Sequence, residues 1–282
     1  MSLRASTMSP ADIDAAQARL PRLFVVPLAT SVKRALIAAA VVLYVLWAGT
    51  QLGITPQRLS EGFGQLGSIL RLMVPPTDNG QLWAYVQAMG ETLGMAFFGT
   101  VIAALLALPL GFLGASTVVS NSLFHFAIRR VFDVFRATPS LIWALIFIGV
   151  VGLGPMAGVM ALILGDFAAL AKLYAEAIEN ADRKPIEGLE ASGAARPLVL
   201  RFGVLPQVLP VMLSQALYFF ESNVRNATVF GIVGAGGIGF YLNERIKLAL
   251  WDQAAFVILF FLVTVAIIDT ISYRIRVWLT KG

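Results

Sequence analysis

An acidic and a basic residue share one helical face within an otherwise apolar run, residues 207–232. Glu221 and Arg225 are four positions apart, the spacing at which side chains are neighbours on a helix and opposite charges attract. A guanidinium also has the planar set of donors that binds the oxygen atoms of an anion such as a carboxylate or a phosphate. The pair therefore predicts either an internal Glu221–Arg225 ion pair that stabilises a helix bundle, or one wall of a path for an anion. The polar residues of this region are Glu221, Asn223, Arg225, Asn226 and Thr228.

Four further charged residues interrupt apolar runs, and a charge at membrane depth needs a partner or a function. Asp166 and Lys172 are six positions apart, so they lie on different helix faces and each is predicted to pair with another helix. Glu91 and Asp269 lie near the ends of their runs, where their side chains are predicted to extend to the membrane surface.

Catalytic and metal-binding chemistry finds little support in the composition. The chain has no cysteine and a single histidine, His125, so the usual metal sites and nucleophile–base sets are missing. We predict that His125 packs in the core or an interface. We expect no metal, no catalytic residue and no enzymatic activity on this chain.

The glycine-rich stretch GAGGIG, Gly234–Gly239, matches the pattern G-x-G-x-x-G. A dinucleotide site would need a preceding strand and an acidic residue about 20 positions later, whereas this stretch follows a long apolar helix. It therefore predicts a tight turn where helices or two protomers approach closely. Gly90 and Gly94 form a GxxxG step that is consistent with close helix packing. No phosphate-binding P-loop pattern occurs, so any ATP must bind another subunit.

Composition indicates a membrane protein. Hydrophobic residues make up 58% of the 282 residues and charged residues only 13%, with a mean hydropathy of +0.81. Soluble domains average about 25% charged residues, and about 20 apolar residues cross a bilayer as a helix. The sequence predicts an all-α, polytopic membrane protein with six transmembrane helices. The predicted spans are residues 35–54, 89–116, 130–152, 156–179, 207–232 and 254–274.

The basic residues set the predicted orientation. With both termini in the cytoplasm, 15 Lys and Arg residues lie in cytoplasmic segments and four in external ones, as the positive-inside rule requires. The same rule explains the net charge of +5 without a nucleic-acid partner. We divide the chain into a cytoplasmic arm (1–34), a first span with an external interfacial helix (35–88) and a core (89–282). The interfacial helix is predicted from the spacing of Leu59, Phe63, Leu66 and Leu70.

The largest interior loop on the predicted cytoplasmic side, about residues 180–206, is rich in charged residues, glycine and proline. Pro185 suits the first turn of a helix, and Gly193 permits a sharp turn with positive φ. Pro197 can begin a second short helix, predicted to end near Pro206. The resulting helix–turn–helix could dock a soluble partner.

This loop resembles the "EAA" coupling loop of ABC importer permeases. Glu187, Gly193 and the ending GVLP have the spacing of that motif, although its two alanines are Gly188 and Leu189 here. The stretches FRATPSLIWALIF, ASGAARPLVLRFGVLPQVLP and FFESNVRNATVFGIVGAGGIGFYL look like the permease subunit of phosphonate importers, over about Met89–Arg276. The resemblance implies ATPase coupling by Glu187, Glu190, Ala191, Gly193, Ala194, Leu205 and Pro206.

The resemblance also implies an assembly. Two permease copies, as a homodimer, would share a path in the bacterial plasma (inner) membrane. Two cytoplasmic ATPase subunits would bind ATP and Mg²⁺, and an extracytoplasmic binding protein would deliver the solute. This chain itself would carry no cofactor.

Two other functions stay open at this point. Methionine-importer permeases share the "LP" and "GIG" neighbourhoods, so the solute could be methionine or another small molecule. An ion-coupled secondary transporter could use Glu221, Arg225 and Asp166 as a relay. The coupling loop favours an ATP-driven importer, because a secondary transporter needs no surface for an ATPase.

Overall fold

The computed structural model of the protein describes residues 28–119 and 121–281, and these residues form helices without any β-strand. Five helices are long and apolar enough to cross a membrane, and a sixth span results if one bent helix pair is counted as a single crossing. The predicted all-α, polytopic membrane fold is confirmed. The chain divides into two compact units, one up to Ile69 and one from Leu70 onward.

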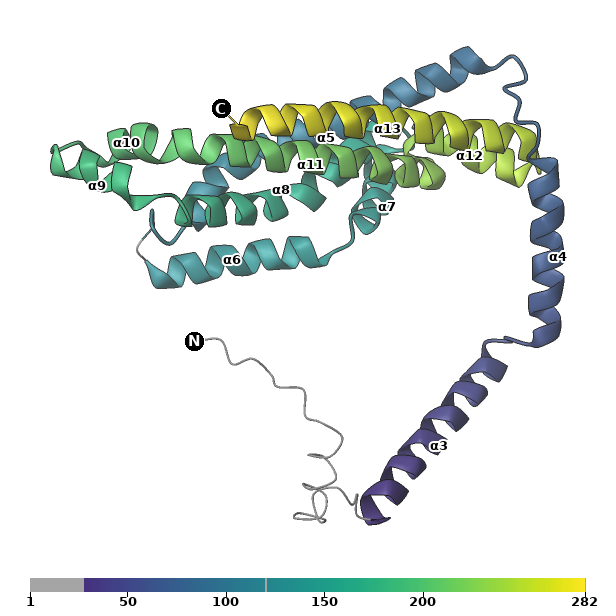
Figure 1. Ribbon diagram of the computed structural model, residues 1–282. Helices are drawn as coiled ribbons and strands as arrows, with labels where there is room; N and C mark the ends of the chain where they lie inside the picture. The colour runs from purple at the N-terminus through teal and green to yellow at the C-terminus, as the bar shows by residue number, and fades with distance from the viewer. Residues whose placement is uncertain (1–27, 120, 282) are drawn as a thin grey trace, which may run out of the picture. The chain divides into compact units, whose positions relative to one another are not determined.

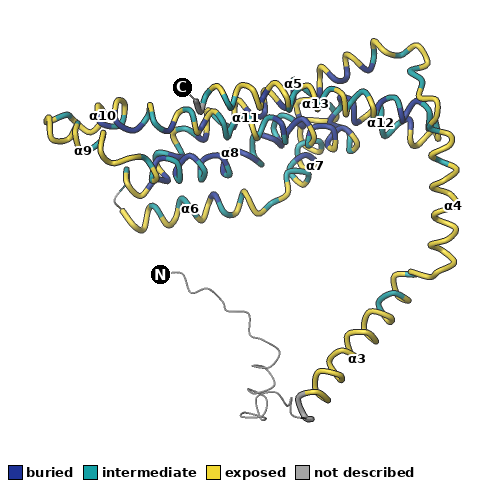
Figure 2. The backbone as a smooth tube through the Cα atoms, viewed as in Figure 1, coloured by how far each residue is buried: buried dark blue, intermediate teal, exposed yellow. Residues whose placement is uncertain are grey.

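The first unit contains α3 (Leu28–Gln51) and most of α4 (Pro56–Leu72). The candidate membrane span Ser31–Gln51 overlaps the predicted first span, and its helix already starts within the predicted cytoplasmic arm. Residues 1–27 of that arm lie outside the described residues. The predicted interfacial segment is a helix, and no residue of α4, which is described throughout, is buried. Figure 2 shows exposed residues along most of both helices.

The second unit is a helix bundle in which α5 (Leu82–Gly114), α8 (Pro155–Glu179), α11 (Leu205–Phe230) and α13 (Trp251–Lys281) run side by side (Figure 1). Helix α8 packs along α5 through small residues. Every fourth residue of the α5 face is Gly or Ala, which lets the two backbones approach closely. These residues are Gly99, Ala103, Ala107 and Gly111.

Close packing therefore occurs on a different part of α5 from the predicted GxxxG step. A Cβ atom on Gly99 would lie 2.6 Å from Cβ of Leu162, and one on Gly111 would lie 2.7 Å from Cβ of Tyr174. Gly90 and Gly94, in contrast, would place a Cβ with no atom of the described residues within 4 Å.

The predicted third span, residues 130–152, is wrong as one continuous helix. The chain forms α6 (Ser122–Ala137) and α7 (Ser140–Val151), which are bent by 81° at the break between them. Pro139 causes the break, because a proline lacks an N–H and disfavours helical backbone at the preceding residue. The predicted turn between the third and fourth spans is confirmed, with φ of +89° at Gly152 and Pro155 in the first turn of α8.

The predicted loop contains α9 (Arg183–Ala191) and α10 (Arg196–Val199), at one end of the bundle (Figure 1). The second short helix does not end near Pro206 as predicted. It continues through a π-helical turn, Leu200–Val204, directly into α11. Pro206 is tolerated there because it lies in the first turn of α11, and the wider π-helical turn separates the two α-helical parts.

The glycine-rich stretch forms the predicted tight turn. A π-helical turn, Gly231–Ala235, follows α11, and the chain reverses through Gly234, Gly236 and Gly237, which all have positive φ. Helix α12 (Gly237–Lys247), which the sequence analysis did not place, then returns alongside the end of α11. Helix α11 precedes this stretch, in the place where a dinucleotide site would need a strand.

Two side chains of α5 hold this turn from the opposite side. Glu91 Oε2 accepts a hydrogen bond from the backbone N–H of Gly237 at 3.1 Å, and Thr92 Oγ1 accepts one from Ile238 at 2.9 Å. These acceptors satisfy donors at the start of α12 that have no partner within the helix. Glu91, which was predicted to extend to the membrane surface, thus has a partner within the protein.

We predict that Gly239→Ala prevents this turn from closing. The added Cβ would lie 1.8 Å from the carbonyl oxygen of Thr228, a backbone atom that cannot move aside. The free energy of unfolding should fall by about 1–3 kcal/mol or more, measured as a lower thermal midpoint of the purified protein in detergent. Gly67→Ala in α4 is the control, since its Cβ would meet no atom of the described residues within 4 Å. An unchanged midpoint for Gly239→Ala would contradict this packing.

Candidate functional site

The polar residues of α11 point to two different neighbours. Asn223 faces the bundle interior, where its side-chain amide donates to Thr100 Oγ1 of α5 at 2.9 Å and to the Asp166 carboxylate of α8. All three side chains are buried, and none is more than 8% exposed. The prediction that Asp166 pairs with another helix is confirmed. Asn226 extends this cluster by donating to Asn223 Oδ1 at 3.4 Å.

Glu221 and Arg225 face α13 and do not pair with each other, so the predicted Glu221–Arg225 ion pair is wrong. Glu221 Oε1 lies 2.9 Å from Arg276 Nη2, and Arg225 Nη1 lies 3.5 Å from Asp269 Oδ1. The acid precedes the base on both helices. Because the helices run antiparallel, each acid meets a base of the other helix. Asp269 is thus paired as well, which corrects its predicted extension to the membrane surface.

The two ion pairs differ in their access to the surroundings. The side chain of Glu221 is 8% exposed and that of Arg276 is 26% exposed, whereas those of Arg225 and Asp269 are 47% and 45% exposed. Thr228 is buried, and its hydroxyl donates to the carbonyl of Val224 in the same helix. Among the predicted path residues, Arg225 is therefore the charged group best placed to meet an anion.

Further ion pairs hold the bundle at the end that carries α9 and α10. Lys172 Nζ lies 3.0 Å from Asp133 Oδ1 of α6, which confirms the prediction that Lys172 pairs with another helix. Glu179 accepts bonds from Arg129 Nη2 at 2.8 and 2.9 Å, and from the backbone N–H of Ser116 at 2.7 Å. The carboxylate of Glu179 thus joins the ends of α5 and α8 to α6. His125, also on α6, is half-buried.

The predicted coupling loop is an exposed helical surface. Glu187, Glu190 and Ala191 are all exposed on α9, none of whose residues, all described, is buried. Gly193 follows with φ of +79°, which confirms the predicted turn, and Ala194 donates its N–H to the carbonyl of Leu189. Positive φ at Gly193 strains any residue with a Cβ. Leu205 and Pro206 lie apart from α9, at the start of α11.

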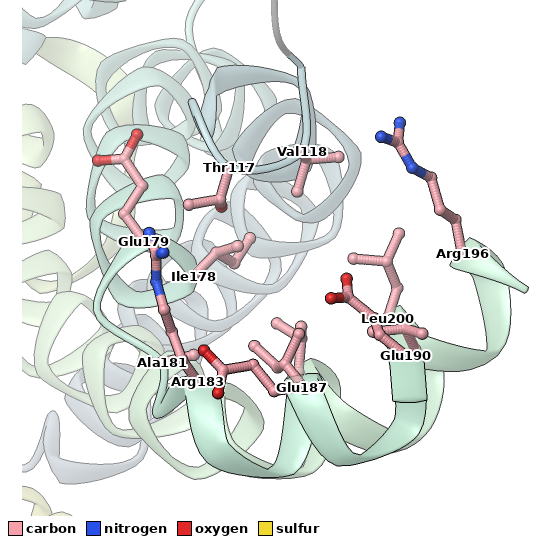
Figure 3. Close-up of a pocket in the computed structure, with 13 residues that line it drawn as sticks. Thr117, Val118, Ile178, Glu179, Ala181, Arg183, Glu187, Glu190, Arg196 and Leu200 are labelled. Carbon is pink, nitrogen blue, oxygen red and sulfur yellow. The ribbon is translucent and has the colours of Figure 1, made fainter. Parts of the chain in front are cut away.

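A cavity of about 340 Å³ lies behind this surface, between α9, α10 and the segment that follows α5 (Figure 3). Its floor is apolar and its rim is charged. Glu187 and Glu190 line it from α9, and Arg196 lines it from α10. Two of the predicted coupling residues therefore border one cavity together with an oppositely charged side chain.

Several contacts were not found from the sequence. Asp269 and Arg276 lie some 50 residues from their partners in α11, and only the predicted antiparallel spans could have suggested these pairs. Gln207 was also overlooked, although its amide joins α11 to the residue that precedes α9. A glutamine at the start of a span carries no distinctive sequence pattern.

The comparisons with known proteins agree with this geometry. The family described as "Binding-protein-dependent transport system inner membrane component" matches residues 107–282. A putative phosphite transport system permease protein, HtxC of Stutzerimonas stutzeri, is 37% identical over 220 residues, which are 78% of each chain. The phosphite transport system permease protein PtxC of the same organism is 34% identical over 240 residues, or 85% of this chain and 86% of PtxC.

A solved structure shares the fold. A chain of the MetNI methionine ABC transporter, in its inward-facing conformations, superposes with a TM-score of 0.64 and 23% sequence identity. The match covers 72% of this chain and 99% of that chain. At this level of identity the likeness supports the fold alone.

We predict that the two α11–α13 ion pairs contribute unequally to stability. Arg276→Gln leaves the buried Glu221 carboxylate without this partner and should lower the free energy of unfolding by about 3–5 kcal/mol. Arg225→Gln breaks the exposed pair and should cost about 0.2–1 kcal/mol. Thermal midpoints of the purified variants test this difference.

The double variant Glu221→Gln with Arg276→Gln serves as the control, because it removes both charges of the pair and should recover most of the lost stability. Equal losses in the two single variants would contradict the assignment of Glu221–Arg276 as the buried pair.

Proposed function

This chain belongs to the family of binding-protein-dependent transport system inner membrane components, and we propose that it is the permease subunit of an ATP-driven importer for a phosphorus oxyanion. It is a multi-pass protein of the plasma membrane. The substrate class rests on one observation: two phosphite transport permeases are 34–37% identical to this chain over 78–85% of its length.

The proposed energy source is a separate pair of ATPase subunits, which bind ATP and Mg²⁺. The sequence contains no P-loop, whereas the exposed helix α9 and the sharp turn at Gly193 provide a surface for a soluble partner. Docking at this surface requires the loop, and with it both termini, to lie in the cytoplasm. The excess of basic residues in these segments supports that orientation.

The proposed path runs between two copies of this chain. A single copy offers only five or six spans, so a homodimer would complete the enclosure. Co-purification of two differently tagged copies tests this arrangement, and recovery of one tag alone would exclude it. An extracytoplasmic binding protein delivers the anion to the assembled pair.

Arg225 is the proposed contact for the anion within the membrane. Its guanidinium is half-exposed and its ion pair with Asp269 is long, at 3.5 Å, so an oxyanion can compete for its donors. Arg276 is less suited because its partner Glu221 is buried. Arg276 thus supports folding and Arg225 meets the solute, although both arginines lie between α11 and α13.

Other solutes have less support. The methionine alternative rests on more distant likenesses, 25% identity over 210 residues to a methionine permease and a shared fold at 23% identity, and no contact in the described bundle favours it. An ion-coupled relay through Glu221, Arg225 and Asp166 is also disfavoured, because Asp166 bonds to Asn223 while the other two residues face α13.

We predict uptake of phosphite or a simple phosphonate that depends on ATP. Cells that lack their own uptake systems would express this chain together with its proposed ATPase and binding-protein partners. Labelled phosphite should accumulate, and excess unlabelled phosphonate should compete for entry while methionine should not. An ATPase partner without activity serves as the control. Competition by methionine and none by phosphorus oxyanions would contradict the proposed substrate.

A further inference from the structure

Helix α9 has few packing contacts with the rest of the bundle. These contacts limit how a displacement of α9 can be passed on to the other helices. Ile186 and Leu189, both half-buried, are its packing residues, and they lie over Gly203. A Cβ on Gly203 would lie 3.1 Å from Leu189 Cδ1 and 3.5 Å from Ile186 Cγ1. Apolar contacts of this kind have no preferred direction, so the surfaces can slide over each other.

Gln207 supplies the directional link that these contacts lack. Its Oε1 accepts a hydrogen bond from the backbone N–H of Asp182 at 2.9 Å, and its Nε2 donates to the carbonyl of Asp182 at 3.2 Å. One side-chain amide therefore pairs with both polar backbone groups of the same residue. Two such bonds fix the orientation of Asp182 as well as its position, since hydrogen bonds weaken steeply when bent.

Asp182 in turn is joined directly to α9. Its carboxylate Oδ1 accepts the backbone N–H of Lys184 at 3.1 Å and thereby caps the first turn of that helix. The same Gln207 Nε2 also donates to the carbonyl of Gly203 at 2.6 Å, within the π-helical turn that precedes α11. Gln207 is thus bonded to the start of α9 and to its own helix segment at once.

The π-helical turn explains why such a link is needed. Leu200–Val204 has wider hydrogen-bond spacing than an α-helix, and Pro206 provides no N–H for the carbonyl of Phe202. A helix bends most easily at such a place. Movement of α9 that reached α11 only through α10 would be absorbed by this bend. The Gln207 amide bypasses the bend, because it connects Asp182 to the α-helical part beyond it.

We infer that Gln207 is a positioning residue that transmits displacement of the coupling loop to α11. Helix α11 carries Arg225 and the buried Asn223, so a shift at its first turn reaches the polar groups at membrane depth. The inference rests on the proposed function, in which an ATPase moves α9. It adds a residue outside the loop to the coupling machinery.

The first test compares two glutamines of α11. Gln207 and Gln215 both line the groove between α8 and α11, but Oε1 of Gln215 has no hydrogen-bond partner among the described residues. Gln207→Leu should retain the ATPase subunits at the stoichiometry of the unmodified complex and keep basal ATP hydrolysis. It should reduce phosphite uptake per ATP hydrolysed by about tenfold. Gln215→Leu should change neither quantity.

The second test restores the link in another form. The chain has no cysteine, so Asp182→Cys with Gln207→Cys introduces a single thiol pair. Uptake per ATP should be low in the free thiol form and should rise severalfold after treatment with a short bifunctional thiol reagent. This variant keeps the inference testable even if Gln207→Leu does not assemble. Its free-thiol and cross-linked forms carry the same substitutions and differ only in the link between positions 182 and 207.

The outcomes separate the inference from the proposed function. Normal uptake by the assembled Gln207→Leu complex would overturn the role of Gln207, and so would a double-cysteine protein whose uptake per ATP does not respond to cross-linking. Absence of ATP-dependent phosphite uptake by the unmodified complex would instead overturn the proposed function.

Discussion

The bilayer cannot hydrate a polar group, so burying a polar side chain at membrane depth is costly unless it finds a partner within the protein. The side-chain amide of Asn223 on α11 provides such a partner for Thr100 of α5 and for Asp166 of α8, and it thereby joins three helices. Small residues on α5 bring the helices close enough for these short side chains to meet. The relative placement of the bundle helices depends on this buried contact.

Two parts of α11 consequently have different properties. In its second half, Asn223 and Glu221 are buried and paired with other helices. At its start, a π-helical turn and the amide of Gln207 connect it to an exposed helix with few packing contacts. A permease that responds to a soluble partner needs this combination of a rigid bundle and a movable surface, since the moving parts are drawn from the less stable regions.

The sequence predicted features whose cause is local. Spans follow from the lengths of apolar runs, and the turns at Gly152 and Gly193 follow from glycine's access to positive φ. The partners of Glu221 and Arg225 could not be predicted in the same way. Their spacing satisfies the i,i+4 rule, but α13 offers Arg276 and Asp269 at the same depth, and tertiary contact prevailed. The bend at Pro139 was overlooked, although the segment before it carries Arg130, Asp133 and Arg136 and only the segment after it, Ser140–Val151, is almost entirely apolar.

The central claim is that the α9 surface receives a cytoplasmic ATPase, and site-specific cross-linking measures this directly. A photo-reactive amino acid placed at Ala191, an exposed residue of α9, would be activated in cells that express the whole transporter. The same group at Gln57, exposed on α4, provides the reference. The account predicts a covalent adduct with the ATPase from position 191 and none from position 57. An ATPase adduct from position 57, with none from position 191, would contradict it.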